Sequence, residues 1–308
     1  MDAREYRGIF VIVTTPFSDD FQLDERALER TMEFCLEAGV HGVVANALAS
    51  EGGYLSEAER KRAAEIVVSA AKGEVPAIVA VSAPHYRLAV DYARHAEAIG
   101  ADAVMALPPT LNSSTVDDIR AYYRAISSAT RLPLVLQNVF GTSASTMNAT
   151  LIVELLRELP NAHYVKEESA YPAQSVGEII RLAGTDLKGI MGGRAGKTLM
   201  EELRHGVSGT MPACEIADVH VALWNAAQQG DQTLARQIFQ RLLPLLDLEA
   251  GYGTPLMKEV LKARGVIPTA AVRQSGFRSL DGNALAEMSA ILQDLRPWML
   301  ERYPPGTN

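Results

Sequence analysis

The sequence has few cysteines, no long apolar run and no excess of positive charge. Cys35 and Cys214 are too few for a disulfide framework, and each lies in an apolar or helical context that is typical of a reduced, partly buried thiol. No window reaches the roughly 18 apolar residues that a membrane-spanning helix needs. The first residues are charged and lack the apolar stretch of a signal peptide. We therefore expect a cytoplasmic protein.

Acidic residues outnumber basic ones by 37 to 29, so the formal net charge is −8. A negative surface repels phosphate backbones and anionic lipid, which disfavours nucleic-acid and membrane partners. The sequence contains no HExxH motif, no CxxC motif and no Asp-rich loop with the spacing of metal ligands. We expect no metal, no other cofactor and a small molecule as the partner.

Short β-branched runs alternate with longer amphipathic stretches over most of the 308 residues. Several of the short runs are apolar throughout, as in strands that are buried on both faces of a parallel sheet. The pattern predicts strands at 9–14, 41–47, 76–82, 102–107, 133–138, 162–167, 187–192 and 207–211. It predicts helices at 25–38, 56–71, 86–100, 115–130, 148–159, 172–183, 195–205 and 216–228.

Eight strand–helix rounds with a period of about 28 residues favour a closed (β/α)8 barrel, an α/β fold of the TIM-barrel class. The alternative, an open doubly wound sheet, normally has a nucleotide-binding loop after its first strand, and residues 14–17 do not form one. After Gly230 the strand signal stops, and helices are expected at 231–246, 255–264 and 282–300. We predict a barrel domain at 1–228 and a C-terminal helical domain at 229–308.

A barrel carries its active site at the carboxyl ends of its strands, which directs attention to the end of the sixth strand. Period-two alternation places Lys166 and Glu168 on one face and Glu167 on the other. Burial of Lys166 inside the barrel would lower its pKa and leave a neutral amine, a nucleophile for a ketone or aldehyde carbonyl. Glu168 is near enough to move a proton. The alternative is a solvated, charged strand end with no chemistry.

Other residues follow strands at the same end of the expected barrel. His85 comes after the third strand as a candidate acid–base residue. Gly192 and Arg194 follow the seventh strand, where N–H groups and a guanidinium would receive an anion, although a simple tight turn is the alternative. We expect Met211 to line the pocket and Cys214 to be inert. His41 and His163 stand at strand starts and are expected to be structural or solvent-facing.

Several segments together resemble the dihydrodipicolinate synthase and N-acetylneuraminate lyase superfamily, from about Arg7 to about Gly265. They are Thr15-Pro16-Phe17, Leu55-Ser56-Glu57-Ala58-Glu59-Arg60, Leu107-Pro108-Pro109, Gln137-Asn138-Val139-Phe140-Gly141 and Val165-Lys166-Glu167. The resemblance implies a class I aldolase or dehydratase on a barrel with C-terminal helices. It also implies that Lys166 forms an imine with a 2-keto acid, and that the protein is a homo-oligomer, a tetramer or a dimer.

The sequence departs from the superfamily at four places. Gln137 stands where a proton-relaying tyrosine is usual, the loop that grips the carboxylate reads Ala47-Leu48-Ala49-Ser50-Glu51, and Leu111 and Thr142 replace a second tyrosine and an arginine. A carboxylate can still be held by the N–H groups of Leu48 and Ala49 and the Ser50 hydroxyl. Gln137 can bind a substrate hydroxyl but cannot ionise, so acid–base work passes to Glu168 or His85.

These departures most resemble the L-2-keto-3-deoxyarabonate dehydratase branch, which implies water loss from a 2-keto-3-deoxy sugar acid. Dehydration requires removal of the C3 proton of the imine and protonation of the C4 hydroxyl, which one carboxylate beside the lysine can perform. A pyruvate-dependent aldolase or synthase is the first alternative. The second is a barrel that has lost catalysis and binds a ligand, since the tyrosine, the threonine pair and the arginine are all replaced.

Overall fold

A computed structural model of the protein describes residues 6–110, 114–140 and 145–306. Eight parallel strands within these ranges form a closed barrel in the order of the chain, which confirms the predicted TIM barrel. The strands are β1 (Gly8–Ile12), β2 (Gly42–Ala45), β3 (Ala77–Ala80), β4 (Ala103–Ala106), β5 (Leu134–Val139), β6 (Ala162–Glu168), β7 (Gly189–Gly192) and β8 (Gly209–Thr210). Their residues are almost all buried, as the continuous apolar runs predict.

Helices alternate with these strands and continue after the last one. They are α1 (Glu25–Glu37), α2 (Glu57–Ala71), α3 (Tyr86–Ala98), α4 (Val116–Ala129), α5 (Ala149–Glu158), α6 (Pro172–Ala183), α7 (Leu199–Glu202), α8 (Ala217–Gln228), α9 (Gln232–Tyr252), α10 (Thr254–Ala263) and α11 (Gly282–Leu295). The helices predicted after Gly230 are thus present as α9, α10 and α11.

In the part of the chain that is described, no helix is long and apolar enough to cross a membrane.

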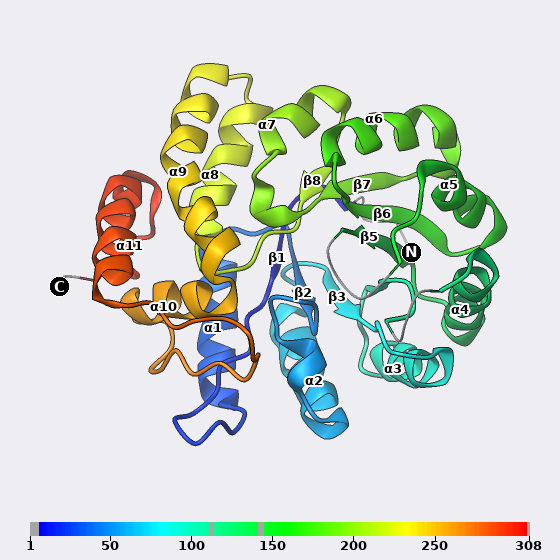
Figure 1. Ribbon diagram of the computed structural model, residues 1–308, viewed down its shortest axis with the longest axis horizontal. Coiled ribbons are helices and arrows are strands. Elements are labelled where there is room, and N and C mark those ends of the chain that lie inside the picture. Colours follow the sequence, from blue (N-terminus) through cyan, green and yellow to red (C-terminus); the bar gives the residue numbers. More distant parts are fainter. Residues whose placement is uncertain (1–5, 111–113, 141–144, 307–308) are drawn as a thin grey trace. The chain divides into compact units, whose positions relative to one another are not determined.

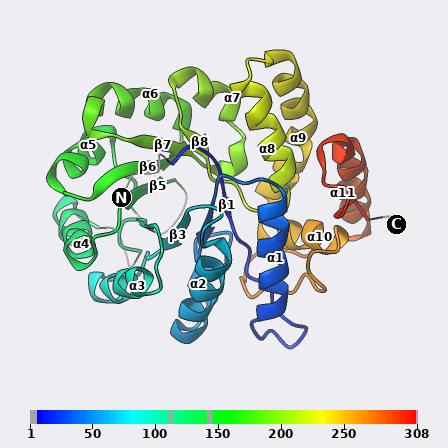
Figure 2. The same cartoon turned by 180° about the vertical axis from the view of Figure 1, so that it is seen from behind.

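The chain divides into two compact units, of which the first combines Met1–Arg7 with Pro76–Met211. In this unit α3, α4, α5 and α6 lie on the outer side of the strands from β3 to β7 (Figures 1 and 2). β5 and β6 pair in parallel over their length, with Gln137 opposite Lys166 and Val139 opposite Glu168. The site residues of β5 and β6 thus occupy fixed register positions.

The second unit combines Gly8–Val75 with Pro212–Asn308 and contains α1, α2 and the helices from α8 to α11. β1 and β2 pair in parallel, with Phe10 opposite Gly42. Cys35 and Cys214 are buried, unbridged thiols in this unit, as expected. The domain boundary between residues 228 and 229 stays a prediction.

Local sequence signals explain most helix ends. The Ser56 hydroxyl accepts the N–H of Glu59, and the Glu59 carboxylate accepts the N–H of Ser56, so the expected capping box starts α2. Thr115 and Asp118 form a second capping box at α4. Gly39 and Gly100 follow helices with positive φ angles, a conformation that costs glycine little. These signals are short-range and do not depend on the rest of the fold.

Three predicted helices differ from the structure by more than two residues at an end. The helix predicted at 282–300 ends at Leu295 and is followed by a 3-10 turn at Arg296–Trp298. The predicted helix at 195–205 is broken into 3-10 turns on either side of the four-residue α7, because Ala195 and Gly196 have positive φ angles of 56° and 77°. The helix predicted to stop at residue 246 continues as α9 to Tyr252 and contains Pro244. Gly253, with φ 61°, ends it. The helix therefore includes Gly251, which lies in the gap between the predicted helices at 231–246 and 255–264.

Candidate active site

Lys166 and Glu168 form a buried pair at the end of β6 in the first unit. Their side chains are 2% and 8% exposed, and Lys166 Nζ lies 2.9 Å from Glu168 Oε1. Residues two apart on a strand share a face, so the contact follows from the period-two pattern. A buried ion pair requires further hydrogen bonds to offset the cost of removing two charges from water.

Neighbouring elements supply these hydrogen bonds to the Glu168 carboxylate. Gln137 on β5 donates from Nε2 to Glu168 Oε1 at 2.7 Å, and the backbone N–H of Arg194 donates to Oε2 at 3.1 Å. Gly193 is packed so closely against this carboxylate that a Cβ atom would overlap it. The carboxylate is therefore held by β5, β6 and the turn after β7.

These contacts determine the ionisation of Glu168. Burial acts to raise the pKa of its carboxyl group, but the charge of Lys166 and the hydrogen bonds from Lys166, Gln137 and Arg194 outweigh burial and lower it. Glu168 is thus a carboxylate at neutral pH that contacts an amine directly. This arrangement can exchange a proton between the two side chains in one step.

Glu167 faces away from Lys166, as the alternation predicts. Its carboxylate accepts hydrogen bonds from Asn138 Nδ2 at 2.9 Å and from the backbone N–H of Ser169 at 2.8 Å. Burial raises the pKa of Glu167 despite these hydrogen bonds. Its partners belong to the chain itself, so Glu167 fixes the end of β6.

Glu202 on α7 is a buried acid that sequence reasoning missed. Its side chain packs against Gly192, where a Cβ atom would overlap the carboxylate, and Thr198 donates a hydrogen bond to Oε1 at 2.8 Å. Burial, reinforced by the charges of Glu167 and Glu168, raises the pKa of Glu202 to about 7. No local signal marks this residue, because its environment is created by packing α7 on β7.

The second unit contains the loop that the sequence analysis assigned to a carboxylate. Ala49 and Ser50 are buried while Leu48 is half-exposed. The backbone N–H groups of Leu48 and Ala49 have no hydrogen-bond acceptor among the described residues, and Ser50 Oγ is buried without a partner there. Thr15 donates to the Ser50 carbonyl at 2.7 Å. Three donors of one short loop thus lack a hydrogen-bond partner among the described residues.

The other predicted site residues have different surroundings. His85 is exposed at the N-cap of α3, and neither Lys166 nor Glu168 has a hydrogen bond or ion pair with it in the described ranges. The Arg194 side chain is exposed and donates to the Ser169 carbonyl at 3.3 Å. Met211 is buried and donates its N–H to the Gly192 carbonyl at 3.0 Å. Leu111 and Thr142 lie outside the described residues.

The two histidines at strand starts, His41 just before β2 and His163 as the second residue of β6, are partly buried. His41 accepts the N–H of Ile9 through Nδ1 at 3.2 Å, and burial lowers its pKa. Burial and the nearby Lys188 lower the pKa of His163. Within the described ranges, no three histidine, cysteine, aspartate or glutamate side chains are grouped as metal ligands.

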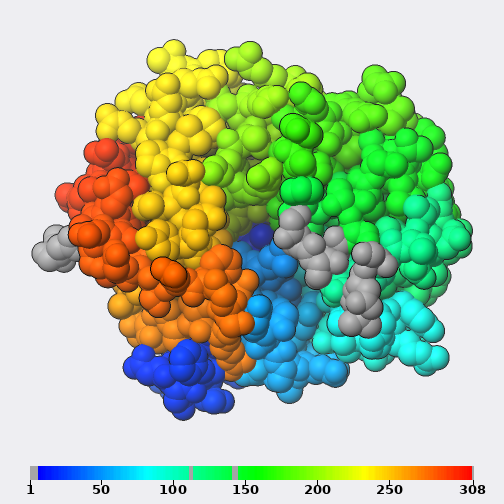
Figure 3. Space-filling view, viewed as in Figure 1, coloured from blue at the N-terminus to red at the C-terminus, as the bar shows by residue number. Residues whose placement is uncertain are grey.

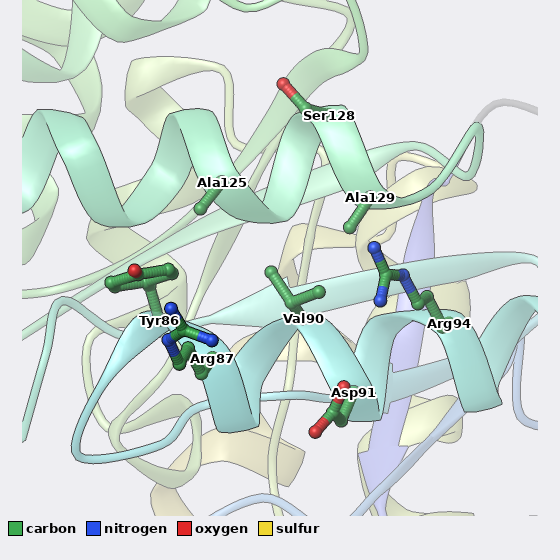
Figure 4. A pocket seen from close by; sticks show the side chains of 8 residues that line it. All are labelled: Tyr86, Arg87, Val90, Asp91, Arg94, Ala125, Ser128 and Ala129. Atoms are coloured by element: carbon green, nitrogen blue, oxygen red, sulfur yellow. The ribbon is translucent and has the colours of Figure 1, made fainter.

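A surface pocket of about 450 Å³ lies between α3 and α4. Tyr86, Arg87 and Val90 line it from α3, and Ala125 and Ser128 line it from α4. In Figure 4 the side chains of Val90 and Ala125 point toward each other across the space between the helices. None of the predicted site residues lines this pocket. It is therefore separate from the candidate site.

Comparison with known proteins decides the family. Residues 5–295 match the dihydrodipicolinate synthetase family. The chain belongs to that family. Its members are lyases, and the buried Lys166–Glu168 pair is the candidate active site of this family member.

Individual relatives within the dihydrodipicolinate synthetase family carry two different names. The chain is 30% identical to L-2-keto-3-deoxyarabonate dehydratase of Azospirillum brasilense, over 96% of both chains. It is 30% identical to 4-hydroxy-tetrahydrodipicolinate synthase of Rhizobium meliloti, over 78% of this chain and 82% of the relative. The crystal structure of dihydrodipicolinate synthase from Rhodopseudomonas palustris superposes with a TM-score of 0.86 at 29% identity, over 94% of this chain and 97% of that one.

Proposed function

We propose that the protein is a Schiff-base dehydratase of a 2-keto-3-deoxy sugar acid, with Lys166 as the nucleophile and Glu168 as the acid–base residue. The observation that carries this proposal is the buried contact of 2.9 Å between Lys166 Nζ and Glu168 Oε1. It is supported by the 30% identity to an L-2-keto-3-deoxyarabonate dehydratase along nearly the whole chain.

The first half of the reaction forms the imine. Lys166 transfers a proton to Glu168 within their contact, and the neutral amine attacks the C2 carbonyl of the keto acid. The nitrogen of the adduct gives a second proton to the former carbonyl oxygen, which yields the carbinolamine. Glu168 then returns its proton to this hydroxyl, which leaves as water and gives a protonated imine. No external acid is required, because the ion pair holds the proton that the step consumes and returns.

The second half removes water from the sugar acid. Glu168, again a carboxylate, takes the C3 proton, and the electron pair of that bond forms an enamine. The same proton then passes to the C4 hydroxyl, and the C4–O bond breaks with release of water. Hydrolysis of the imine regenerates the Lys166 amine. Gln137, which holds Glu168 in place, cannot relay a proton, so this scheme uses one carboxylate for both transfers.

We assign carboxylate binding to groups that have no hydrogen-bond partner among the described residues. The N–H groups of Leu48 and Ala49 and the hydroxyl of Ser50 would bind the carboxylate of the keto acid, a role that needs donors fixed in place. Gly192, Arg194 and Met211 would contact the distal part of the substrate. We propose no metal and no cofactor for this chemistry. His85 remains the second candidate for acid–base work.

A pyruvate-dependent aldolase or synthase is the second candidate function. It is favoured by relatives named 4-hydroxy-tetrahydrodipicolinate synthase, which align with 78% of this chain. In this reaction Lys166 would form the same kind of imine with the keto acid, but pyruvate would be formed or consumed. A ligand-binding barrel without catalysis is a third reading, based on the replaced tyrosine, threonine pair and arginine.

One assay separates the three. A panel of 2-keto-3-deoxy acids is incubated with the protein, and pyruvate release and water loss are measured separately. The proposal predicts water loss without pyruvate. Pyruvate release would show that the protein is an aldolase. Binding of a keto acid without turnover of any member of the panel would show a ligand-binding barrel without catalysis.

A further inference from the structure

The loop from Asn46 to Gly52 has a backbone that its own residues do not favour. Asn46 and Glu51 have positive φ angles of 61° and 52°, which are uncommon for residues with a side chain. Gly52 lies so close to the Asn46 carbonyl that a Cβ atom would overlap it. A strained loop of this kind persists only when its surroundings impose it.

A buried ion pair from the C-terminal helices is one such constraint. Glu51 Oε1 lies 2.5 Å from Lys258 Nζ of α10, and both side chains are 0% exposed. This contact is an ion pair, and its angles at Oε1 are not those of a hydrogen bond. Lys258 donates a hydrogen bond to the Ala271 carbonyl oxygen instead, at 2.7 Å. Burial lowers the pKa of Lys258 to about 8, and Glu51 opposes this. Each charge depends on the other to remain buried.

The segment after α10 holds the second oxygen of the same carboxylate. Glu51 Oε2 accepts the backbone N–H of Arg273 at 2.8 Å and that of Gln274 at 2.7 Å. These residues are more than 200 positions away in the sequence, so no local pattern predicts the contacts. Glu51 thereby joins the loop after β2 to residues 258–274.

Arg273 fixes that segment in turn. Its guanidinium donates to both oxygens of Glu59, at 2.6 and 2.9 Å, and to the Phe21 carbonyl. Figure 3 shows the orange C-terminal segment lying against the blue residues that follow β1 and the lighter blue residues of α2. Arg273 therefore joins residues 258–274 to the loop before α1 and to the first turn of α2.

The loop that these contacts hold also contains the unpartnered donors. Ser50, the neighbour of Glu51, is 1% exposed and its hydroxyl has no hydrogen-bond partner among the described residues. Burial of a hydroxyl without a hydrogen-bond partner is unfavourable, and the carboxylate of a ligand would supply the partner that Ser50 lacks. A small movement of Glu51 would move Ser50 directly.

We propose that Lys258 and Arg273 are positioning residues for substrate binding, which hold Glu51 and thereby aim the Leu48–Ser50 donors at the carboxylate of the keto acid. The C-terminal helices would then set affinity for the keto acid without touching it. The inference rests on the proposed function, which assigns the carboxylate of the keto acid to this loop.

The test uses pyruvate, the smallest 2-keto acid, and borohydride reduction of the full-length protein. The yield of covalent adduct at Lys166 is measured by mass spectrometry against pyruvate concentration. Lys258→Met is expected to raise the half-saturating concentration on the order of tenfold, because displaced binding groups weaken binding, while the adduct yield at saturation stays as in the wild type. Lys262→Met is the matched control on α10, since Lys262 is exposed and pairs only with Glu259 of its own helix in the described contacts.

If Lys258→Met does not fold, Arg273→Gln tests whether the C-terminal segment positions the Leu48–Ser50 loop. Arg273 is less buried than Lys258, and the variant keeps the backbone N–H that binds Glu51. We expect an increase of roughly threefold in the half-saturating concentration, with the adduct at saturation unchanged. A half-saturating concentration equal to that of the wild type in a folded variant overturns the inference alone. The absence of any adduct in the wild type overturns the proposed function and the inference with it.

Discussion

At the scale of single residues, the main feature is a lysine that must be both buried and reactive. Lys166 is 2% exposed and paired with Glu168, and an ammonium in an ion pair is not a nucleophile. In the proposed mechanism, direct transfer of its proton to Glu168 would resolve this conflict, because the acceptor is already in contact. The sequence predicts that the two residues share a face, since strand alternation is local.

Glu168→Gln tests the acid–base role. The amide keeps the shape of the side chain but cannot accept a proton, so we expect kcat to fall by about 10²- to 10⁴-fold with KM changed by only a few fold. Steady-state kinetics on the substrate found in the panel assay measures the effect. His85→Gln is made in parallel, and a larger loss in that variant than in Glu168→Gln would transfer the role to His85.

Glu202 gives a prediction on stability. Its pKa is raised to about 7, so between pH 4.5 and 7 the folded state keeps a proton that the unfolded state has lost. Folding stability therefore falls as pH rises through this window, and the cost above pH 7 is about 3 kcal/mol. Glu202→Gln removes the ionisation, so its unfolding free energy relative to the wild type should increase by this order between pH 5 and pH 8.

Urea unfolding at the two pH values measures the difference. Glu287→Gln is the control, because Glu287 is exposed on α11 and is not among the charges that raise the pKa of Glu202, and its difference from the wild type should change far less between the two pH values. A difference for Glu202→Gln that does not change with pH would contradict the assigned ionisation.

At the scale of elements, the turn after β7 holds the site carboxylate from outside β6. Gly193 leaves room for Glu168, and the N–H of Arg194 binds it. From its glycines, the sequence predicts a turn at this position that binds an anion of the substrate. The structure shows that the N–H of Arg194 is already used by a carboxylate of the chain, which no local pattern reveals.

Gly193→Ala is expected to displace the Glu168 carboxylate and lower kcat by on the order of tenfold or more. Gly193 has a φ of −139°, which any residue adopts, so the effect is steric. Gly251→Ala is the control, because a Cβ there meets nothing within 4 Å and the residue lies inside α9. It should leave kcat unchanged and raise the unfolding free energy by about 0.5–1 kcal/mol. Equal kcat values in the two variants would contradict the role given to Gly193.

At the scale of the whole molecule, the barrel was predictable because it repeats one strand–helix unit, and each repeat carries its own apolar run and helix ends. The sequence does not predict the contacts of Glu51 with Lys258, Arg273 and Gln274, because these contacts join residues more than 200 positions apart. The candidate site divides in the same way. Lys166 and Glu168 follow from strand alternation, whereas Glu202 and the C-terminal contacts depend on packing.

The oligomeric state is also a property of this scale. The family resemblance predicts a homo-oligomer, a tetramer or a dimer. Sedimentation velocity at micromolar concentration is expected to give a species of four or two chains. A single-chain species across the concentration range would contradict this prediction without affecting the chemistry assigned to Lys166.

The most direct test of the central claim is chemical trapping of the imine. The protein is incubated with a 2-keto acid, reduced with borohydride and digested, and the modified peptide is identified by mass spectrometry. The account predicts a covalent adduct on Lys166 that is absent from the Lys166→Met variant. A folded wild-type protein with no adduct, or with the adduct on another lysine, would contradict it.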